Sequence, residues 1–263
     1  MTDDPFGAGL RKDALREDGF LGGRLRILQP AQGYRAGADA VMLAAACPAR
    51  AGQSVLELGC GAGVALLCLG SRVPDLALSG LELQPAYAAL AQRNAQANAI
   101  PARIHQGDLG HMPAELRAES FDQVIANPPY FLGGTIAPDH GRGTARHEDT
   151  PLEDWIAAGL RRLRPGGEIT LIQRADRLGA ILSALAQKAG AIKILPISAR
   201  AGREAGRVIV TARKGARTPL RLFSAFILHA NPSHSADGED LTEAAQAVLR
   251  EGAALAPARP DFR

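Results

Sequence analysis

The 263-residue chain has few aromatic residues and few cysteines, and each shortage excludes something. Aromatic residues make up only 4% of it, so a core must consist mostly of alanine, leucine, valine and isoleucine. The three cysteines, Cys47, Cys60 and Cys68, are odd in number and lack metal-ligand spacing. This pattern argues against disulfides and for a cytoplasmic protein. No stretch approaches the roughly 20 apolar residues of a membrane span, and none resembles a secretion signal.

The chain also lacks a large excess of either charge. It has 30 lysines and arginines and 27 aspartates and glutamates, for a net charge of +3. A role in nucleic-acid binding therefore cannot be inferred from the total and depends on where the cationic side chains lie. The six histidines lack the spacing of metal ligands, so no metal is expected as a partner.

Strand and helix patterns alternate from residue 54 onward, which predicts βαβ units. The expected fold class is α/β: a Rossmann-like, doubly wound, mostly parallel sheet of seven strands. Its last two strands, at 191–195 and 208–212, lack a helix between them and are expected to form a C-terminal antiparallel hairpin. The other five strands of this sheet are expected at 55–58, 77–82, 102–105, 121–126 and 168–173. A hairpin strand at 24–28 is expected to cover the core, and 223–229 to add one more edge strand. Helices are expected at 40–47, 64–72, 85–98, 152–163, 176–189 and 241–255. Residues 1–20 are expected to be flexible and 21–263 to form one domain.

A glycine-rich turn, Glu57-Leu-Gly-Cys-Gly-Ala-Gly63, joins the strand at 55–58 to the next helix. Gly59, Gly61 and Gly63 lack Cβ atoms, so the backbone can approach a ligand closely, and the helix N-terminus offers unpaired N–H groups. Val64 stands where a dinucleotide fingerprint has its third glycine. The turn therefore departs from the pyrophosphate-binding pattern, and the carboxylate of a methionine, which is smaller than a pyrophosphate, is an adequate anion for it. The alternative is an ordinary structural turn.

Acidic residues lie at the ends of three successive strands of this series. Glu82, followed by Leu83, lies nineteen residues past Gly63 and can accept both hydroxyls of a ribose. Asp108, in the pair Gly107-Asp108, can accept from an adenine amino group. Glu57 precedes the glycine turn, so the three carboxylates are expected along one edge of the sheet. Together they predict an adenosyl ligand, while solvated charges at strand ends are the alternative.

The most specific element is Asn127-Pro128-Pro129-Tyr130, directly after the strand at 121–126. The Asn127 side-chain oxygen and a backbone carbonyl of the rigid Pro-Pro turn can accept the two hydrogens of a planar NH₂ group. This pairing frees the nitrogen lone pair for attack, so catalysis would consist of positioning and desolvation. Tyr130 offers a flat face for stacking. With the glycine turn and Glu82, this motif predicts methyl transfer from S-adenosylmethionine to an sp² amino nitrogen.

Basic residues gather in two places late in the chain. Between residues 199 and 221, seven arginines and lysines stand against a single glutamate, Glu204. The second group follows Tyr130, in a loop at 133–150 that is long enough to be functional or disordered. We expect these groups to contact the phosphates of an RNA partner, with a solvated face as the alternative. The arginines predicted to do so are Arg142, Arg146, Arg200, Arg203 and Arg207.

From about residue 25 to 255 the chain resembles the class I S-adenosylmethionine-dependent methyltransferases that carry an Asn-Pro-Pro-Tyr motif. Among them it is most similar to the bacterial adenine-N6 methyltransferases of valine tRNA, which modify the adenine just 3′ of the anticodon. The similarity includes the segment Gly33-Tyr-Arg-Ala-Gly-Ala-Asp-Ala-Val-Met-Leu43 and a late strand at 207–210. The resemblance implies that Gly37 and Asp39 lie near the methionine part of the donor, and that Asn127 lines both donor and acceptor sites.

The shared motifs define the reaction type better than the substrate, so alternatives stay open. Relatives with the same motif methylate a glutamine amide of release factors, guanine in ribosomal RNA, or adenine in DNA. The glutamine enzymes usually carry a helical N-terminal domain, and only some fifty residues precede the glycine turn here. A non-catalytic adenosyl-binding module that acts as an RNA-binding or assembly factor is the third alternative. The intact Asn127-Pro-Pro-Tyr130 motif argues against it.

Overall fold

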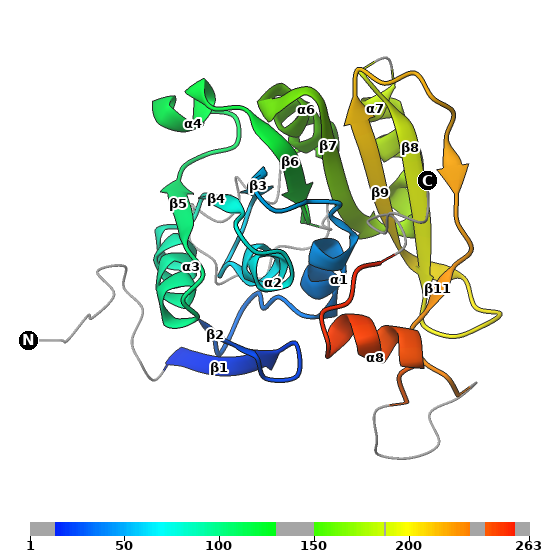
Figure 1. The fold of residues 1–263 in the computed structure, drawn as a ribbon, viewed down its shortest axis with the longest axis horizontal. Helices are drawn as coiled ribbons and strands as arrows, with labels where there is room; N and C mark the ends of the chain where they lie inside the picture. Colours follow the sequence, from blue (N-terminus) through cyan, green and yellow to red (C-terminus); the bar gives the residue numbers. More distant parts are fainter. Residues whose placement is uncertain (1–13, 130–149, 187, 232–239, 256–263) are drawn as a thin grey trace, which may run out of the picture.

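The computed structural model describes residues 14–129, 150–186, 188–231 and 240–255. Its main sheet has the strand order β10-β8-β9-β7-β6-β3-β4-β5, with β11 also paired to β8 (Figure 1). The long strands are β3 (Ser54–Leu58), β4 (Ala77–Glu82), β5 (Ala102–Gln106), β6 (Phe121–Ala126), β7 (Leu163–Arg174), β8 (Ala189–Ser198) and β9 (Ala205–Lys214). Neighbours from β5 to β7 are parallel, whereas β9 is antiparallel to both β7 and β8. The predicted doubly wound α/β sheet with a late antiparallel hairpin is confirmed.

Two layers of helices cover this sheet, each packed over its own apolar cluster. One cluster holds Val41 of α1, Leu66 of α2 and Leu90 of α3, and the other holds Trp155 of α6 and Ile181 of α7. Aliphatic residues dominate both clusters, as the scarcity of aromatic residues predicts. The helices are α1 (Ala38–Ala46), α2 (Val64–Arg72), α3 (Pro85–Ala97), α4 (Ala114–Ala118), α6 (Leu152–Arg162), α7 (Leu178–Leu185) and α8 (Glu243–Leu249), with a 3₁₀ turn, η2 (Ala175–Arg177), before α7.

The structure differs from the expected elements at both ends and near β7. Strand β1 (Leu15–Phe20) pairs antiparallel with β2 (Leu25–Pro30), so residues 15–20 form a strand inside the stretch expected to be flexible. Its side chains are mostly not buried, which is why the apolar pattern gave no signal. In place of one strand at 223–229 there are two of two residues each, β10 (Arg221–Leu222) and β11 (Phe226–Ile227). The sequence patterns do not predict helix α4. Strand β7 begins at Leu163, earlier than the expected strand at 168–173, because Leu163 already pairs with Phe121 of β6.

Two asparagines, one on α3 and one just after it, hold the β1–β2 hairpin to the domain. Asn94 is fully buried: its Oδ1 accepts from the N–H of Leu28 (2.9 Å), and its Nδ2 donates to the carbonyls of Leu28 (3.0 Å) and Ala62 (2.9 Å). Asn98, one helical turn later, bonds the N–H and carbonyl of Arg26 in the same way. Because Ala62 lies within the glycine turn, Asn94 also joins the hairpin to that turn.

Replacing Asn94 with alanine is expected to lower the free energy of unfolding by about 3 kcal/mol, because buried backbone groups on two segments lose their partners. The half-buried Asn98 is the matched control, and its replacement with alanine should cost about 1 kcal/mol, since water can replace its bonds. Urea unfolding of both variants measures the difference. Equal losses would contradict the anchoring role of Asn94.

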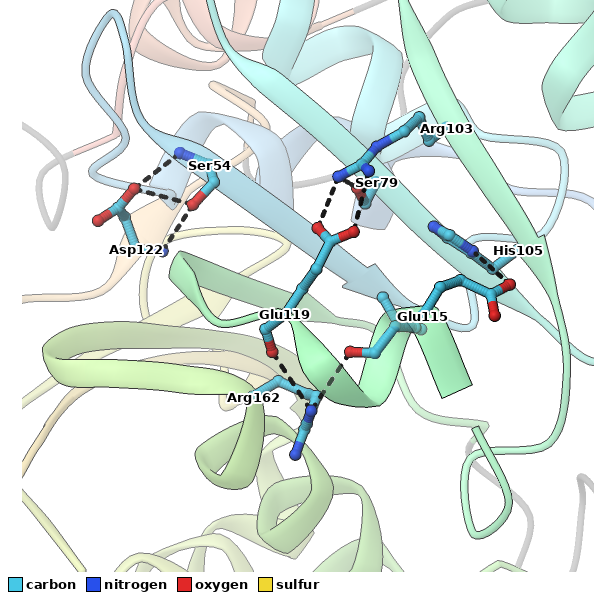
Figure 2. Close-up of polar contacts among 9 residues, drawn as sticks. Ser54, Ser79, Arg103, His105, Glu115, Glu119, Asp122 and Arg162 are labelled. Carbon is cyan, nitrogen blue, oxygen red and sulfur yellow. Dashed lines mark hydrogen bonds and ion pairs between the residues drawn. The ribbon is translucent and has the colours of Figure 1, made fainter. Parts of the chain in front are cut away.

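The amino ends of the strands are joined by a separate polar cluster (Figure 2). Asp122, at the start of β6, accepts from the backbone N–H (2.8 Å) and hydroxyl (2.9 Å) of Ser54 at the start of β3. Nearby, Glu119 accepts two bonds from Arg103 of β5. Burial raises the pKa of Asp122, but the bonds from Ser54 and Arg164 outweigh it and hold that pKa below its usual value. The amino ends are therefore occupied by internal contacts, whereas the glycine turn, Glu82 and Asn127 lie at the carboxyl ends of the strands.

Candidate functional site

The carboxyl ends of four neighbouring strands place the predicted motifs side by side. In the parallel ladders Leu58 of β3 pairs with Leu81 of β4 on one side and with Ala126 of β6 on the other. The residues that follow these positions, Gly59, Glu82 and Asn127, therefore leave the sheet at the same level. Strand order reverses between β3 and β6, which is where open α/β sheets bind ligands.

The glycine turn has the strand–turn–helix geometry that the sequence predicts. Gly59, Gly61 and Gly63 all adopt positive φ (66°, 53° and 86°), the left-handed region where a side chain would be strained. Gly63 is the residue before α2, and a Cβ there would lie 3.4 Å from the Cβ of Ala91. The left-handed φ of all three residues therefore accounts for the glycines, and Gly63 also lies in close contact with α3.

Glu82 is nearly fully buried at the end of β4 and faces the glycine turn. Its Oε2 accepts from the N–H of Gly61 (2.9 Å) and its Oε1 accepts from the N–H of Gln84 (2.8 Å). These bonds fix the plane of the carboxylate. Each oxygen keeps further acceptor capacity, so the pair suits two neighbouring hydroxyls of a ribose.

Glu57 lies deeper than the sequence pattern indicates. It is the fourth residue of β3, is 4% exposed, and accepts from the N–H of Leu66 in α2 (2.9 Å). Burial raises the pKa of Glu57 well above its ordinary value, the bond from Leu66 opposes this, and Glu82 adds to it. A cationic ligand above the turn would favour the charged carboxylate.

The segment before α1 forms one side of the site. Gly37 is the residue before α1, and a Cβ built on it meets no atom within 4 Å. Asp39, in the first turn, pairs with Arg207 of β9 (2.9 Å). Tyr34, which is 59% exposed, lies over the glycine turn, where a Cβ on Gly61 would come 4.0 Å from its ring. Tyr34 was missed as a site residue, although it lies inside the segment 33–43 that the resemblance singled out.

Gly107 and Asp108 follow β5, as predicted, but their local contacts are structural. Gly107 donates to the carbonyl of Glu82 (2.9 Å), and a Cβ on it would come 2.7 Å from Cδ of Pro113. Asp108 accepts from the N–H of Gly110 (2.6 Å). Beside them is an open cleft of about 570 Å³ between this loop and α6, lined by Asp108, Leu109, Gly110, His111, Thr150, Pro151, Asp154 and Arg161.

The Asn127-Pro-Pro turn begins directly after β6, next to the glycine turn. Asn127 is half-buried and Pro128 is buried. The carbonyl of Pro128 accepts a hydrogen bond from Nε2 of Gln173, the next-to-last residue of β7 (3.1 Å). Tyr130, Arg142 and Arg146 lie outside the described residues.

The three late arginines have different surroundings. Arg200 bonds Asp240 (2.8 Å) and the carbonyl of Asn231, with its side chain only 12% exposed. Arg203 is exposed, and Arg207 is held by Asp39 at the carboxyl edge. Among these three arginines only Arg203 is exposed enough to contact a phosphate, while Arg207 lies close to the segment 33–43 through its bond to Asp39.

Residues 36–195 match the family model of the methyltransferase small domain, which is more than half of the chain. The chain belongs to the methyltransferase small domain family. This match confirms the prediction from the sequence that the chain belongs to a methyltransferase family that uses S-adenosylmethionine as its donor. In the part of the chain that the structure describes, no helix is long and apolar enough to cross a membrane, and no three potential metal ligands cluster.

Similar curated proteins are named tRNA1(Val) (adenine(37)-N6)-methyltransferase. One from Porphyromonas gingivalis is 37% identical over 164 residues, which is 59% of this chain and 64% of that protein. The chain thus matches less than two thirds of this relative's length. One from Yersinia enterocolitica is 30% identical over 211 residues, which is 78% of this chain and 84% of that protein.

Solved structures agree on the fold. A protein from Agrobacterium tumefaciens, described as a predicted O-methyltransferase, superposes with a TM-score of 0.66 at 26% identity, over 82% of this chain and 98% of that chain. A 16S rRNA N2 G1207 methyltransferase from Thermus thermophilus, in complex with AdoMet and guanosine, gives a TM-score of 0.53 at 21% identity. It covers 76% of this chain and 50% of that chain, and the likeness shows the fold alone.

Proposed function

We propose that this protein transfers a methyl group from S-adenosylmethionine to the exocyclic N6 of an adenine in tRNA, beside the anticodon of valine tRNA. The observation that carries the proposal is the adjacency of the glycine turn and the Asn127-Pro-Pro turn, fixed by the pairing of Leu58 with Ala126. The names of the Porphyromonas and Yersinia relatives support the choice of adenine and of tRNA. A tRNA substrate would place the enzyme in the cytoplasm.

The residues around the glycine turn fit the predicted donor. Glu82 is held by two backbone N–H groups and can accept from ribose hydroxyls, while Gly37 and Gly61 leave space beside Tyr34. Asp39 and Glu57 provide carboxylates near a cationic methionine group. When bound, S-adenosylmethionine supplies a methyl group already activated on a sulfonium.

The Asn127-Pro-Pro turn would hold the acceptor. The side-chain oxygen of Asn127 and the carbonyl of Pro128 accept the two amino hydrogens, which localises the lone pair on N6. No general base is needed before attack, so these two acceptors contribute by position. Tyr130 would stack the base, as the sequence predicts. An adenine in a stacked loop must first be extruded, at a cost of a few kcal/mol.

The arginines would contact the RNA backbone rather than the base. Arg203 is exposed and suited to this, and Arg142 and Arg146 stay predictions from the sequence. Arg207 and Arg200 are engaged by Asp39 and Asp240 and would act through those contacts.

Incubation of the purified protein with radiolabelled S-adenosylmethionine and separate tRNA, ribosomal RNA and protein fractions tests the proposal. We expect label in tRNA, recovered as N6-methyladenosine by mass spectrometry of the nucleosides. Unmodified valine tRNA transcribed in vitro should accept the methyl group, and the same transcript with guanine in place of adenine 37 should not. Label only in protein would indicate a glutamine-amide methylase, and label as N2-methylguanosine a ribosomal RNA enzyme. Donor binding with no transfer would indicate a silent module.

A further inference from the structure

Gln173 holds the acceptor turn from the neighbouring strand. The pairing of Ala126 with Leu171 places Pro128, two residues on, at the level of Gln173 across the β6–β7 ladder. There the Nε2 of Gln173 donates to the Pro128 carbonyl (3.1 Å), and its Oε1 accepts from the N–H of Arg174 (2.9 Å). Both ends of the side-chain amide are therefore engaged, so its orientation is fixed.

The backbone of Gln173 is held in place, just as its side-chain amide is held in one orientation. The residue is 2% exposed, and its backbone pairs with Val208 of β9 while β6 flanks the other side of β7. A buried, doubly bonded amide in the middle of a sheet has little freedom to move. A carbonyl oxygen has two lone pairs, so the bond from Gln173 occupies one and leaves the other for a further donor.

We propose that Gln173 is a positioning residue of the methyl transfer: its Nε2–H aims the Pro128 carbonyl so that the second lone pair meets one hydrogen of the acceptor amine. This inference rests on the proposed function and assigns a role to a side chain outside the Asn127-Pro-Pro-Tyr130 motif. Misplacement of a reacting group by about 1 Å can cost 100-fold in rate, so one such bond matters.

Two substitutions test the role. Gln173→Met keeps the size of the side chain and removes both hydrogen bonds, and it is expected to lower kcat about 100-fold. The KM for tRNA and the Kd for S-adenosylmethionine should stay within about twofold, because those contacts lie elsewhere. Single-turnover methylation and calorimetric titration measure these quantities.

Gln173→Glu adds a signature that a purely structural role would not give. When protonated, a glutamic acid can donate to the Pro128 carbonyl and accept from the Arg174 N–H, as the amide does. When ionised, it only accepts and repels that carbonyl. Burial raises the pKa of such a carboxyl. The kcat of this variant relative to the wild type should therefore rise as the pH falls from about 8 to about 6.

Gln123 provides the matched control. It is also a buried glutamine, in β6, but four residues before Asn127 and so about 13 Å away along the strand. Its Nε2 donates to Oε1 of Gln53. Gln123→Met should lose stability and keep kcat, and Gln123→Glu should show the pH profile of the wild type.

The outcomes separate this inference from the proposed function. Wild-type protein inactive on every acceptor would overturn both. Two results obtained with an active wild-type protein would overturn the positioning role alone. One is a Gln173→Met variant whose kcat lies within twofold of the wild type, and the other is a loss of kcat in Gln123→Met equal to that in Gln173→Met. If Gln173→Met does not fold, Gln173→Glu decides: a flat relative pH profile contradicts the proposal, and a rise toward acid supports it.

Discussion

Replacing Asn127 with alanine is expected to lower kcat by up to about 1000-fold, the scale of losing a directed polar contact to the reacting group. The Kd for S-adenosylmethionine should stay within about twofold, because the proposed donor contacts come mainly from the glycine turn and from Glu82, which Gly61 holds in place. The physical reason is that Asn127 follows β6 beside the glycine turn, where its side-chain oxygen is proposed to accept from the amine of the acceptor. Methylation assays at saturating donor and calorimetric titration measure the two effects.

Two further variants make this result specific. Asn127→Asp keeps an acceptor oxygen at the same place and should retain more activity than the alanine variant. Asn98→Ala, directly after α3 at the contact with β2, removes an asparagine away from the carboxyl ends of the strands and should keep the wild-type kcat. An Asn127→Ala protein that turns over at a comparable rate would exclude the acceptor role of the turn.

Glu82→Gln is expected to weaken donor binding about 100-fold, with kcat at saturating donor within about threefold of the wild type. The amide has one acceptor oxygen, so it cannot serve both Gly61 and Gln84 and still accept from two hydroxyls. The loss of charge-assisted hydrogen bonds amounts to about 3 kcal/mol, which corresponds to this factor.

Glu168→Gln is the control for Glu82→Gln. Glu168 is also buried in a strand, but it lies in the first half of β7 and is bonded to Arg213 (2.6 Å). Its replacement should change stability and leave donor affinity unaltered. Equal affinity losses in both variants, or less than a threefold loss in Glu82→Gln, would rule out Glu82 as the ribose anchor.

The parts of the site that depend on neighbours in the sequence could be predicted. A strand followed by glycines and then an apolar helix specifies the turn at 59–63, and the left-handed φ of those glycines bears this out. Because parallel strands end at the same side of a sheet, Glu82 and Asn127 were expected near the glycine turn, and the pairing of Leu58 with Leu81 and with Ala126 places them on either side of β3 at the same level. The roles assigned to individual residues there remain predictions for the variants above.

Contacts between distant segments were not accessible from the sequence. Arg207 and Asp39 are 168 residues apart, and neither signals the other in the chain. Gln173 lies in an ordinary buried strand pattern, and only the β6–β7 register brings it to Pro128. Gly107 was assigned to ligand binding, although its lack of a side chain already has a structural reason in the approach of Pro113. Arg200 lies in a basic run, yet Asp240 neutralises it in space.

A crystal structure with S-adenosylhomocysteine and an adenosine nucleotide tests most directly whether donor and acceptor occupy adjoining turns. The expected result has ribose hydroxyls on Glu82, the sulfur facing the Asn127-Pro-Pro turn, and the adenine N6 between Oδ1 of Asn127 and the Pro128 carbonyl. A sulfur that points away from that turn, or a turn with no room for a planar amine, would contradict it.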